Sequence, residues 1–257
     1  MSLQSHLSQS RLVRLLQEWA QVDGDAARHD VAERLGGWLG AMDTVKLESA
    51  LQSIQAYATQ SRDTLPPAMA LEPAWLETLL QRTRSDIDDM IAAKLNAPAP
   101  MRGRVIRVAA TASADEAEAD YAVHYQRYLD LQKRIELKLG QLRGQIRQLL
   151  AKGSVPMRQL AAMDAVMEQM LSAREQKLLS SVPVYLERRF SHWRQWHQQR
   201  LQISGRDDDP ALWRQSGGWL AGFLRDWQDM LQAELQVRLM PVVGMIEAVQ
   251  KEHRTQQ

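Results

Sequence analysis

Histidine is the side chain most often used for proton transfer and metal binding near neutral pH, and the chain has six of them. The two closest in sequence, His192 and His197, lie five positions apart. That spacing does not place two imidazoles on one helix face, as the four-residue spacing of helical zinc motifs does. We therefore expect no metal site, and we interpret His197, which lies in an apolar stripe, as a hydrogen-bonded core residue.

Carboxylates and glycines are the other residues that could support catalysis. Asp88-Asp89 and the three aspartates at 207–209 have no candidate base or nucleophile beside them, so we interpret them as solvated charge. The glycines at 36, 37 and 40 lack the preceding strand and the following Lys-Ser/Thr of a phosphate-binding loop. The absence of cysteine excludes thiolate chemistry. We expect a non-enzyme with no catalytic residue and no cofactor, and a nuclease is the open alternative.

Arginine and tryptophan are interleaved in the C-terminal half, a combination that can hold a phosphate backbone and stack bases. Trp196 and Trp219 lie off the apolar stripes, so we expect them to be exposed. A second group of arginines, at positions 102, 104 and 107, has no acidic residue between its members. The candidate nucleic-acid or partner-binding residues are Arg102, Arg104, Arg107, Arg188, Arg189, Arg194, Trp196, Arg200 and Trp219. The competing interpretation is a solvated basic helix face whose arginine stems cover the tryptophan rings.

The elements that would position these residues are helices. Good helix formers dominate the chain, and strand-like alternation is confined to Arg104–Val108, so we expect an all-α protein. The sequence has no signal peptide and no run of about eighteen apolar residues, which predicts a cytoplasmic protein with no membrane insertion. The net charge of +1 means that any nucleic-acid binding must depend on local patches.

Breaks in the pattern divide the chain into three predicted segments. Residues 1–95 form a small N-terminal helical domain, in which Pro73 starts the last helix. Residues 96–113 form a basic Pro/Ala linker. Residues 114–257 form an antiparallel bundle built on one long helix, which begins after a capping box at Ser113 and Glu116. We expect the main domain boundary to lie in the linker.

The long helix is marked by a 4-3 heptad spacing of apolar residues. The seam consists of Tyr121, Tyr125, Tyr128, Gln132, Ile135, Leu139, Leu142, Ile146 and Leu149. We expect a helix from about 114 to 151, on the order of 55 Å long at ~1.5 Å per residue. Gln132 leaves two interpretations open. It either sets the register of a self-associating coiled coil or faces a polar group within the monomer.

A short turn at Gly153-Ser154 predicts that the next helix folds back on the long one. That helix carries a methionine-rich stripe, which we expect to be the partner of the seam. The stripe includes Met163, Met167 and Met170. We therefore interpret the seam as the spine of an intramolecular bundle whose function lies on its outer faces.

Glycines and prolines predict the remaining interruptions. Gly140 and Gly144 either allow a second helix to pack closely against the long helix or only make the long helix narrower at these positions. Val182-Pro183 predicts a break or a kink. Asp209 predicts the cap of a helix that starts at the following proline, and Pro241 predicts the kink or end of that helix.

Several segments together resemble a bacterial family of unknown biochemical function. The matching stretches are Arg34–Gly40 with Asp43, Tyr125–Arg134, Leu160–Glu168, Arg174–Pro183 and Leu186–Phe190. The chain is similar to the accessory component of the third type of Zorya anti-phage defence system. Such proteins are encoded beside a MotA-like ion-driven membrane motor and an OmpA/MotB-like partner. The resemblance implies no catalytic residue, and it implies a non-catalytic accessory role in defence.

Two kinds of partner follow from these observations. The resemblance and the seam favour binding to the cytoplasmic tail of the MotA-like motor protein or to a second accessory defence protein. The basic and tryptophan-rich helix faces favour DNA as the alternative partner. The sequence leaves the oligomeric state open.

Overall fold

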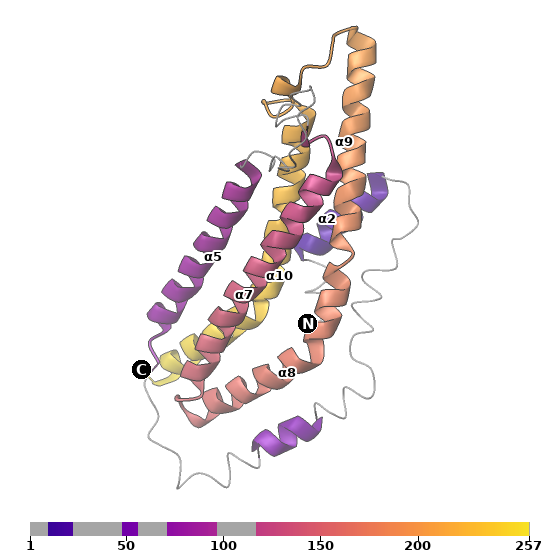
Figure 1. The fold of residues 1–257 in the computed structure, drawn as a ribbon. Coiled ribbons are helices and arrows are strands. Elements are labelled where there is room, and N and C mark those ends of the chain that lie inside the picture. Colours follow the sequence, from indigo (N-terminus) through magenta and orange to yellow (C-terminus); the bar gives the residue numbers. More distant parts are fainter. Residues whose placement is uncertain (1–9, 23–47, 56–70, 97–116, 257) are drawn as a thin grey trace, which may run out of the picture.

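The computed structural model describes residues 10–22, 48–55, 71–96 and 117–256, and every regular element among them is helical (Figure 1). The elements are α2 (Arg11–Val22), α5 (Pro73–Asn96), α7 (Tyr121–Leu150), α8 (Val155–Leu179), α9 (Val182–Ser204), the 3-10 helix η2 (Pro210–Leu212) and α10 (Trp219–Gln256). Residues 48–55 are also helical. The expected all-α class is confirmed, as is the start of a helix at Pro73.

The central element is α10, which packs against α2, α5, α7, α8 and α9. Figure 1 shows it running through the middle of the molecule beside α7. Its buried side chains include Phe223, Trp227 and Met230. Ile87 and Ile91 of α5 are completely buried in the same core. Helices α2 and α5 come from the segment 1–95, so these two helices share a core with the C-terminal helices.

The long helix α7 begins later than predicted. Residues 118–120 form a turn, and Asp120 caps the helix by accepting a hydrogen bond from the amide of Ala122 at 2.9 Å. The helix has 30 residues, or about 45 Å at ~1.5 Å per residue. Glu118 lies in this turn, and its side chain is buried. The predicted capping box at 113–116 lies outside the described residues.

The heptad seam is buried along its middle, from Tyr128 to Ile146, and it drifts at both ends. At the start of α7, His124 and Arg127 are buried, whereas Tyr125 is 37% exposed. At the other end the buried residue is Leu150. A straight α-helix repeats every 3.6 residues, so a strict heptad rotates away from the core along its length. The packing of α7 against several helices explains why it does not follow the heptad throughout.

The polar residue in the seam faces a polar group of the same chain. The amide nitrogen of Gln132 donates a hydrogen bond to the carboxylate of Glu234 on α10, at 2.9 Å. Of the two interpretations of Gln132, the intramolecular one is observed.

Helix α8 follows α7 after a short turn, as predicted, but its methionines are not the main cover of the seam. Met163, Met167 and Met170 are only half-buried and lie outside the core cluster. The buried residues of α8 are Met157, Ala161, Asp164 and Leu179 instead. The seam helix packs on α5, α9 and α10 as well as on α8. The expected pairing of methionine stripe and seam is therefore wrong.

The predicted interruptions take definite forms. Val182-Pro183 marks a break, because α8 ends at Leu179 and α9 begins at Val182. Asp209 caps only the short η2, and the long helix begins later, after Gly217, whose φ of +86° favours glycine. Pro241 lies inside α10, which continues beyond it and changes direction in its C-terminal half (Figure 1).

The glycines of the described helices have different surroundings. A Cβ atom at Gly140 or Gly144 would meet nothing within 4 Å, so no other described helix approaches closely there. A Cβ atom at Gly222 would lie 2.6 Å from the ring of Trp193. The close approach of two helices is thus made at Gly222, between α9 and α10.

Candidate functional site

The predicted basic and aromatic face is not brought together as one surface. Arg102, Arg104 and Arg107 lie outside the described residues. Trp219 is 1% exposed, so the expectation that it is exposed is wrong. It begins α10 and packs its ring against those of Phe190 and Trp213. Burial in this aromatic cluster removes Trp219 from any binding surface.

Arg189 holds the helices together. Its Nε and Nη2 atoms donate to Oδ2 of Asp226 on α10, at 2.9 and 2.6 Å. The indole of Trp193 donates to the same oxygen at 2.7 Å. The guanidinium of Arg189 also lies over the ring of Trp19 on α2, 5.3 Å from its centre. Arg189 is therefore occupied by contacts within the molecule.

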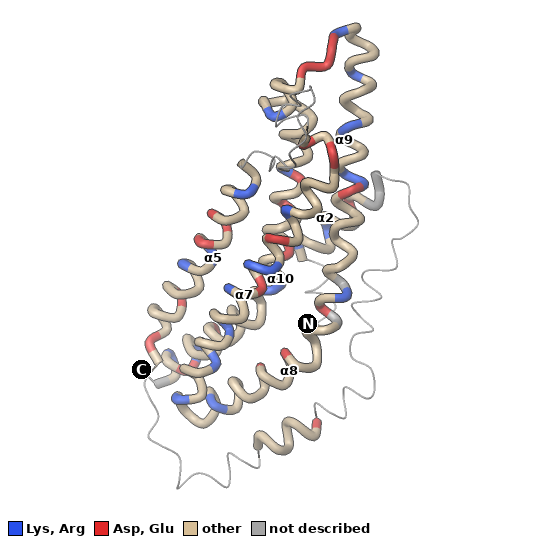
Figure 2. The backbone as a smooth tube through the Cα atoms, in the orientation of Figure 1, with Lys and Arg blue, Asp and Glu red and all other residues tan. Residues whose placement is uncertain are grey.

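The other three arginines of this face are exposed on α9, and Figure 2 shows basic positions along that helix. The guanidinium of Arg200 covers the ring of Trp196 at 4.7 Å. Arg194 donates to the backbone oxygen of Ala119 at 2.8 Å. Arg188 lies 6.0 Å from the ring of Tyr185. The pairing of Arg200 with Trp196 matches the interpretation in which arginine stems cover tryptophan rings.

His197 is hydrogen-bonded, as predicted, but it is half-buried and not a core residue. Its Nε2 lies 2.8 Å from Oδ1 of Asp208, which also accepts a hydrogen bond from the indole of Trp213 at 2.7 Å. The imidazole lies near the rings of Trp213 and Trp219. These contacts attach the loop after α9 to the helix that precedes it.

A buried ionic cluster lies at the start of α7. The carboxylate of Glu118, which is 1% exposed, accepts hydrogen bonds from Arg127 at 2.6 Å and from two nitrogens of Arg214 at 2.5 and 2.7 Å. Arg214 also donates to the backbone oxygen of Leu95, the penultimate residue of α5, at 3.0 Å. Burial by itself would raise the pKa of Glu118, but the hydrogen bonds from Arg214 and Arg127 outweigh it and lower the pKa. The cluster joins three parts of the chain.

His124 lies beside this cluster as a neutral imidazole. Its ring packs against Phe190 and Phe223. Its Nε2 lies 2.9 Å from the backbone oxygen of Glu118, so the proton of the neutral ring is on Nε2. Burial lowers the pKa of His124 to about 4. His124 is therefore uncharged at neutral pH and has a packing role.

A second buried carboxylate, Glu234, lies between α7 and α10. It accepts hydrogen bonds from the hydroxyl of Tyr128 at 3.2 Å and from Gln132, and Arg238 lies 3.3 Å away on the same helix. Burial raises the pKa of Glu234 to about 7. The sequence carries a signal for this residue, because Glu234 falls seven positions after Trp227 on the buried face of α10.

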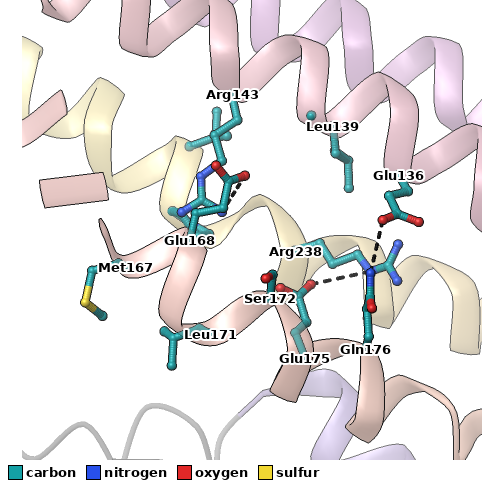
Figure 3. A pocket seen from close by; sticks show the side chains of 13 residues that line it. Glu136, Leu139, Arg143, Met167, Glu168, Leu171, Ser172, Glu175, Gln176 and Arg238 are labelled. Carbon is teal, nitrogen blue, oxygen red and sulfur yellow. Dashed lines mark hydrogen bonds and ion pairs between the residues drawn. The ribbon is translucent and has the colours of Figure 1, made fainter. Parts of the chain in front are cut away.

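Sequence reasoning missed a pocket of about 270 Å³ between α7, α8 and α10. Its apolar lining includes Leu139, Leu171 and Val242. Figure 3 shows charged side chains from all three helices around it, among them Glu136 and Arg238. No linear motif marks this pocket, because its residues come from three helices separated in the sequence.

Ion pairs between α7 and α8 lie at one side of the pocket, whose lining includes Arg143 and Glu168. Two nitrogens of Arg143 donate to the two carboxylate oxygens of Asp164, at 2.9 and 2.7 Å. Glu168 pairs with Arg147 and lies 3.5 Å from Arg143. Across the pocket, Glu175 of α8 lies 3.6 Å from Nε of Arg238. The charged groups thus fix α8 against its neighbours.

The described residues contain no group of three or more His, Asp or Glu arranged to hold a metal ion. No described helix is both long and apolar enough to span a bilayer. The carboxylates of the pocket are held by arginine and glutamine side chains, with no nucleophile and base in hydrogen-bond contact among them.

The fold and the pocket define an all-α protein that packs around a central helix and has a charged groove between three of its helices. The chain belongs to the family described as "Protein of unknown function (DUF3348)", whose model matches residues 1–251. Neither the curated proteins nor the solved structures provide a match.

Proposed function

We propose that this chain is a non-catalytic accessory protein of bacterial anti-phage defence, and that it works by binding a protein partner. The observation that carries the binding role is the groove between α7, α8 and α10, which has an apolar floor and a charged rim. The defence role follows from the resemblance to the third type of Zorya system. The partner is the cytoplasmic tail of the MotA-like motor protein or the second accessory protein.

Co-purification tests this function. The tagged full-length chain is expressed together with the motor protein and the second accessory protein, and its retained partners are identified by mass spectrometry. We expect at least one of the two to be retained at physiological salt. Retention of neither, with the tagged chain folded, overturns the proposal.

DNA binding is a second candidate, favoured by the exposed Arg188, Arg194 and Arg200 on α9. Phosphate contacts release counterions, so binding of this kind must weaken steeply as salt increases. A mobility-shift titration between about 50 and 200 mM salt tests it. The comparison is a variant in which Arg188, Arg194 and Arg200 are all replaced by glutamine. Absence of a shifted band at the lower salt concentration removes this candidate.

A further inference from the structure

We propose that the groove between α7, α8 and α10 binds a basic amphipathic helix of a partner protein. The inference rests on the proposed partner-binding function and names the surface and the chemistry of the partner. It follows from three properties of the described residues: an apolar stripe on α8 outside the core, the size of the adjoining pocket, and the charge around that pocket.

The apolar stripe lies on one face of α8. Met163, Met167 and Met170 follow at steps of four and three, the spacing of one helix face. All three are half-buried and none belongs to the core or to the apolar residues packed against it, whereas Leu160 does pack on the core. Methionine adapts its shape to different apolar partners and is frequent on surfaces that bind helices.

The pocket opens beside this stripe. Met167 and Leu171 of α8 are part of its lining, together with Pro241 and Val242 of α10. Its volume of about 270 Å³ is below the ~300–1,000 Å³ of pockets that enclose a drug-sized molecule. A single long side chain from a helix lying on α8 fits this space better than a free ligand does.

The charge of the pocket selects the kind of side chain. Its rim and the ion partners of that rim comprise four carboxylates and three guanidinium groups, namely Glu136, Asp164, Glu168 and Glu175 with Arg143, Arg147 and Arg238. Glu136 accepts one hydrogen bond, from the neutral amide of Gln176 at 3.3 Å (Figure 3). The carboxylates outnumber the cations, which favours a lysine or arginine side chain in the pocket.

The arrangement of carboxylates around the pocket does not suit a bare metal ion. No three carboxylates or imidazoles of the described residues converge on one point. The negative charge is spread over Glu136, Glu168 and Glu175, on two helices and along the pocket. Spread charge matches a basic side chain that has an apolar stem, because the stem can lie on Leu139 and Leu171 while the head group reaches a carboxylate.

Fluorescence anisotropy with a model peptide tests the proposal. The probe is a fluorescein-labelled 18-residue helix made of lysine and leucine, and its counterpart has glutamate in place of lysine. The variants of the full chain are Glu136→Gln and Met167→Lys. The matched control is Glu187→Gln, which neutralises an exposed carboxylate on α9. Circular dichroism establishes that each variant is folded.

We expect the lysine peptide to bind at least ten-fold more tightly than the glutamate peptide. Glu136→Gln should weaken its binding three- to five-fold, which is the size of a partly exposed ion pair. Met167→Lys should weaken it more than ten-fold, and Glu187→Gln should leave it unchanged. Equal binding of the two peptides, or unchanged binding to Met167→Lys, overturns the proposal.

Two further results separate this inference from the proposed function. If the motor tail or second accessory protein still co-purifies with Met167→Lys at the original yield, the partner-binding function stands and the groove is the wrong surface. If light scattering finds a dimer that Met167→Lys dissociates, the stripe is covered by a second copy of the chain, and the basic-helix proposal fails.

Discussion

At the residue scale, the fold places a carboxylate where its charge is costly. Glu234 is 2% exposed, and its hydrogen-bond partners Tyr128 and Gln132 are both neutral. The charged groups that face it are Arg238 on its own helix and Glu175 on α8. Burial outweighs the favourable charge of Arg238, so the folded protein holds a proton on Glu234 that the unfolded chain releases.

This raised pKa predicts a loss of stability as the pH rises. The unfolded carboxyl titrates near 4.5 and the folded one near 7, so the protonated group stabilises the fold below 4.5 and that contribution is lost up to about pH 7. At about 1.4 kcal/mol per pKa unit, the loss is on the order of 3 kcal/mol.

The Glu234→Gln variant tests the prediction, because glutamine cannot ionise. Urea unfolding of both proteins between pH 4.5 and pH 8 should give a stability difference that grows in favour of Glu234→Gln as the pH rises. A difference that stays constant across this range would show that Glu234 has an ordinary pKa in the folded protein.

At the element scale, α10 contains glycines with opposite roles. Gly222 lies against the ring of Trp193, and that ring is held by the hydrogen bond from its indole to Asp226. A Cβ atom at Gly244 would meet nothing within 4 Å. The first glycine permits the contact between α9 and α10, whereas the second only lowers the helix propensity of α10.

These positions give a matched pair of substitutions in one helix. Gly222→Ala should lower the free energy of unfolding by about 1–3 kcal/mol, because the added methyl group overlaps a fixed ring. Gly244→Ala should raise it by about 0.5–1 kcal/mol. Chemical denaturation of the two variants measures both changes, and equal effects of the two substitutions would contradict the described contact of Trp193 with Gly222.

Sequence periodicity predicted the elements better than it predicted their partners. The apolar spacing identified the helix that contains Ile135 and Leu142, Pro73 correctly marked a helix start, and Val182-Pro183 correctly marked an interruption. Only α8 was expected as a partner of that helix, and its contacts with α5, α9 and α10 were not foreseen, because spacing shows which face is apolar but not which helices cover it. The pocket could not be predicted at all, since it exists only where three separately encoded helices meet.

The same limit applies to the candidate site residues. Trp219 has the same composition-based signal as Trp196, yet one is 1% exposed and the other lies half-buried under Arg200. The difference arises because η2 and the Gly217 turn delay the start of α10 and rotate Trp219 into the core. A shift of a few residues in a helix start is enough to exchange a surface residue for a core residue.

At the scale of the whole molecule, α2, α5, α7, α8, α9 and α10 share one hydrophobic core. Ile87 of α5 and Trp227 of α10 are both completely or almost completely buried in it. Arg11 of α2 forms an ion pair with Asp229 of α10 at 2.5 Å, which adds a contact from the first described helix. Parts of the chain more than 200 positions apart should therefore unfold together.

The Ile87→Ala variant tests this cooperativity. Truncation of a fully buried isoleucine should cost about 2–5 kcal/mol. Far-ultraviolet circular dichroism and tryptophan fluorescence should report a single coincident transition in both proteins, shifted equally in the variant. Two separate transitions, of which Ile87→Ala moves only one, would indicate that α5 belongs to an independent unit.

The guanidinium of Arg214 contacts both Leu95 and Glu118, and this has a consequence for protein engineering. The two ends of the segment between these residues meet at one side chain, so the fold sets no minimum span for the connection. A design that replaces this connection therefore needs only to keep Leu95 and Glu118 within hydrogen-bond reach of Arg214.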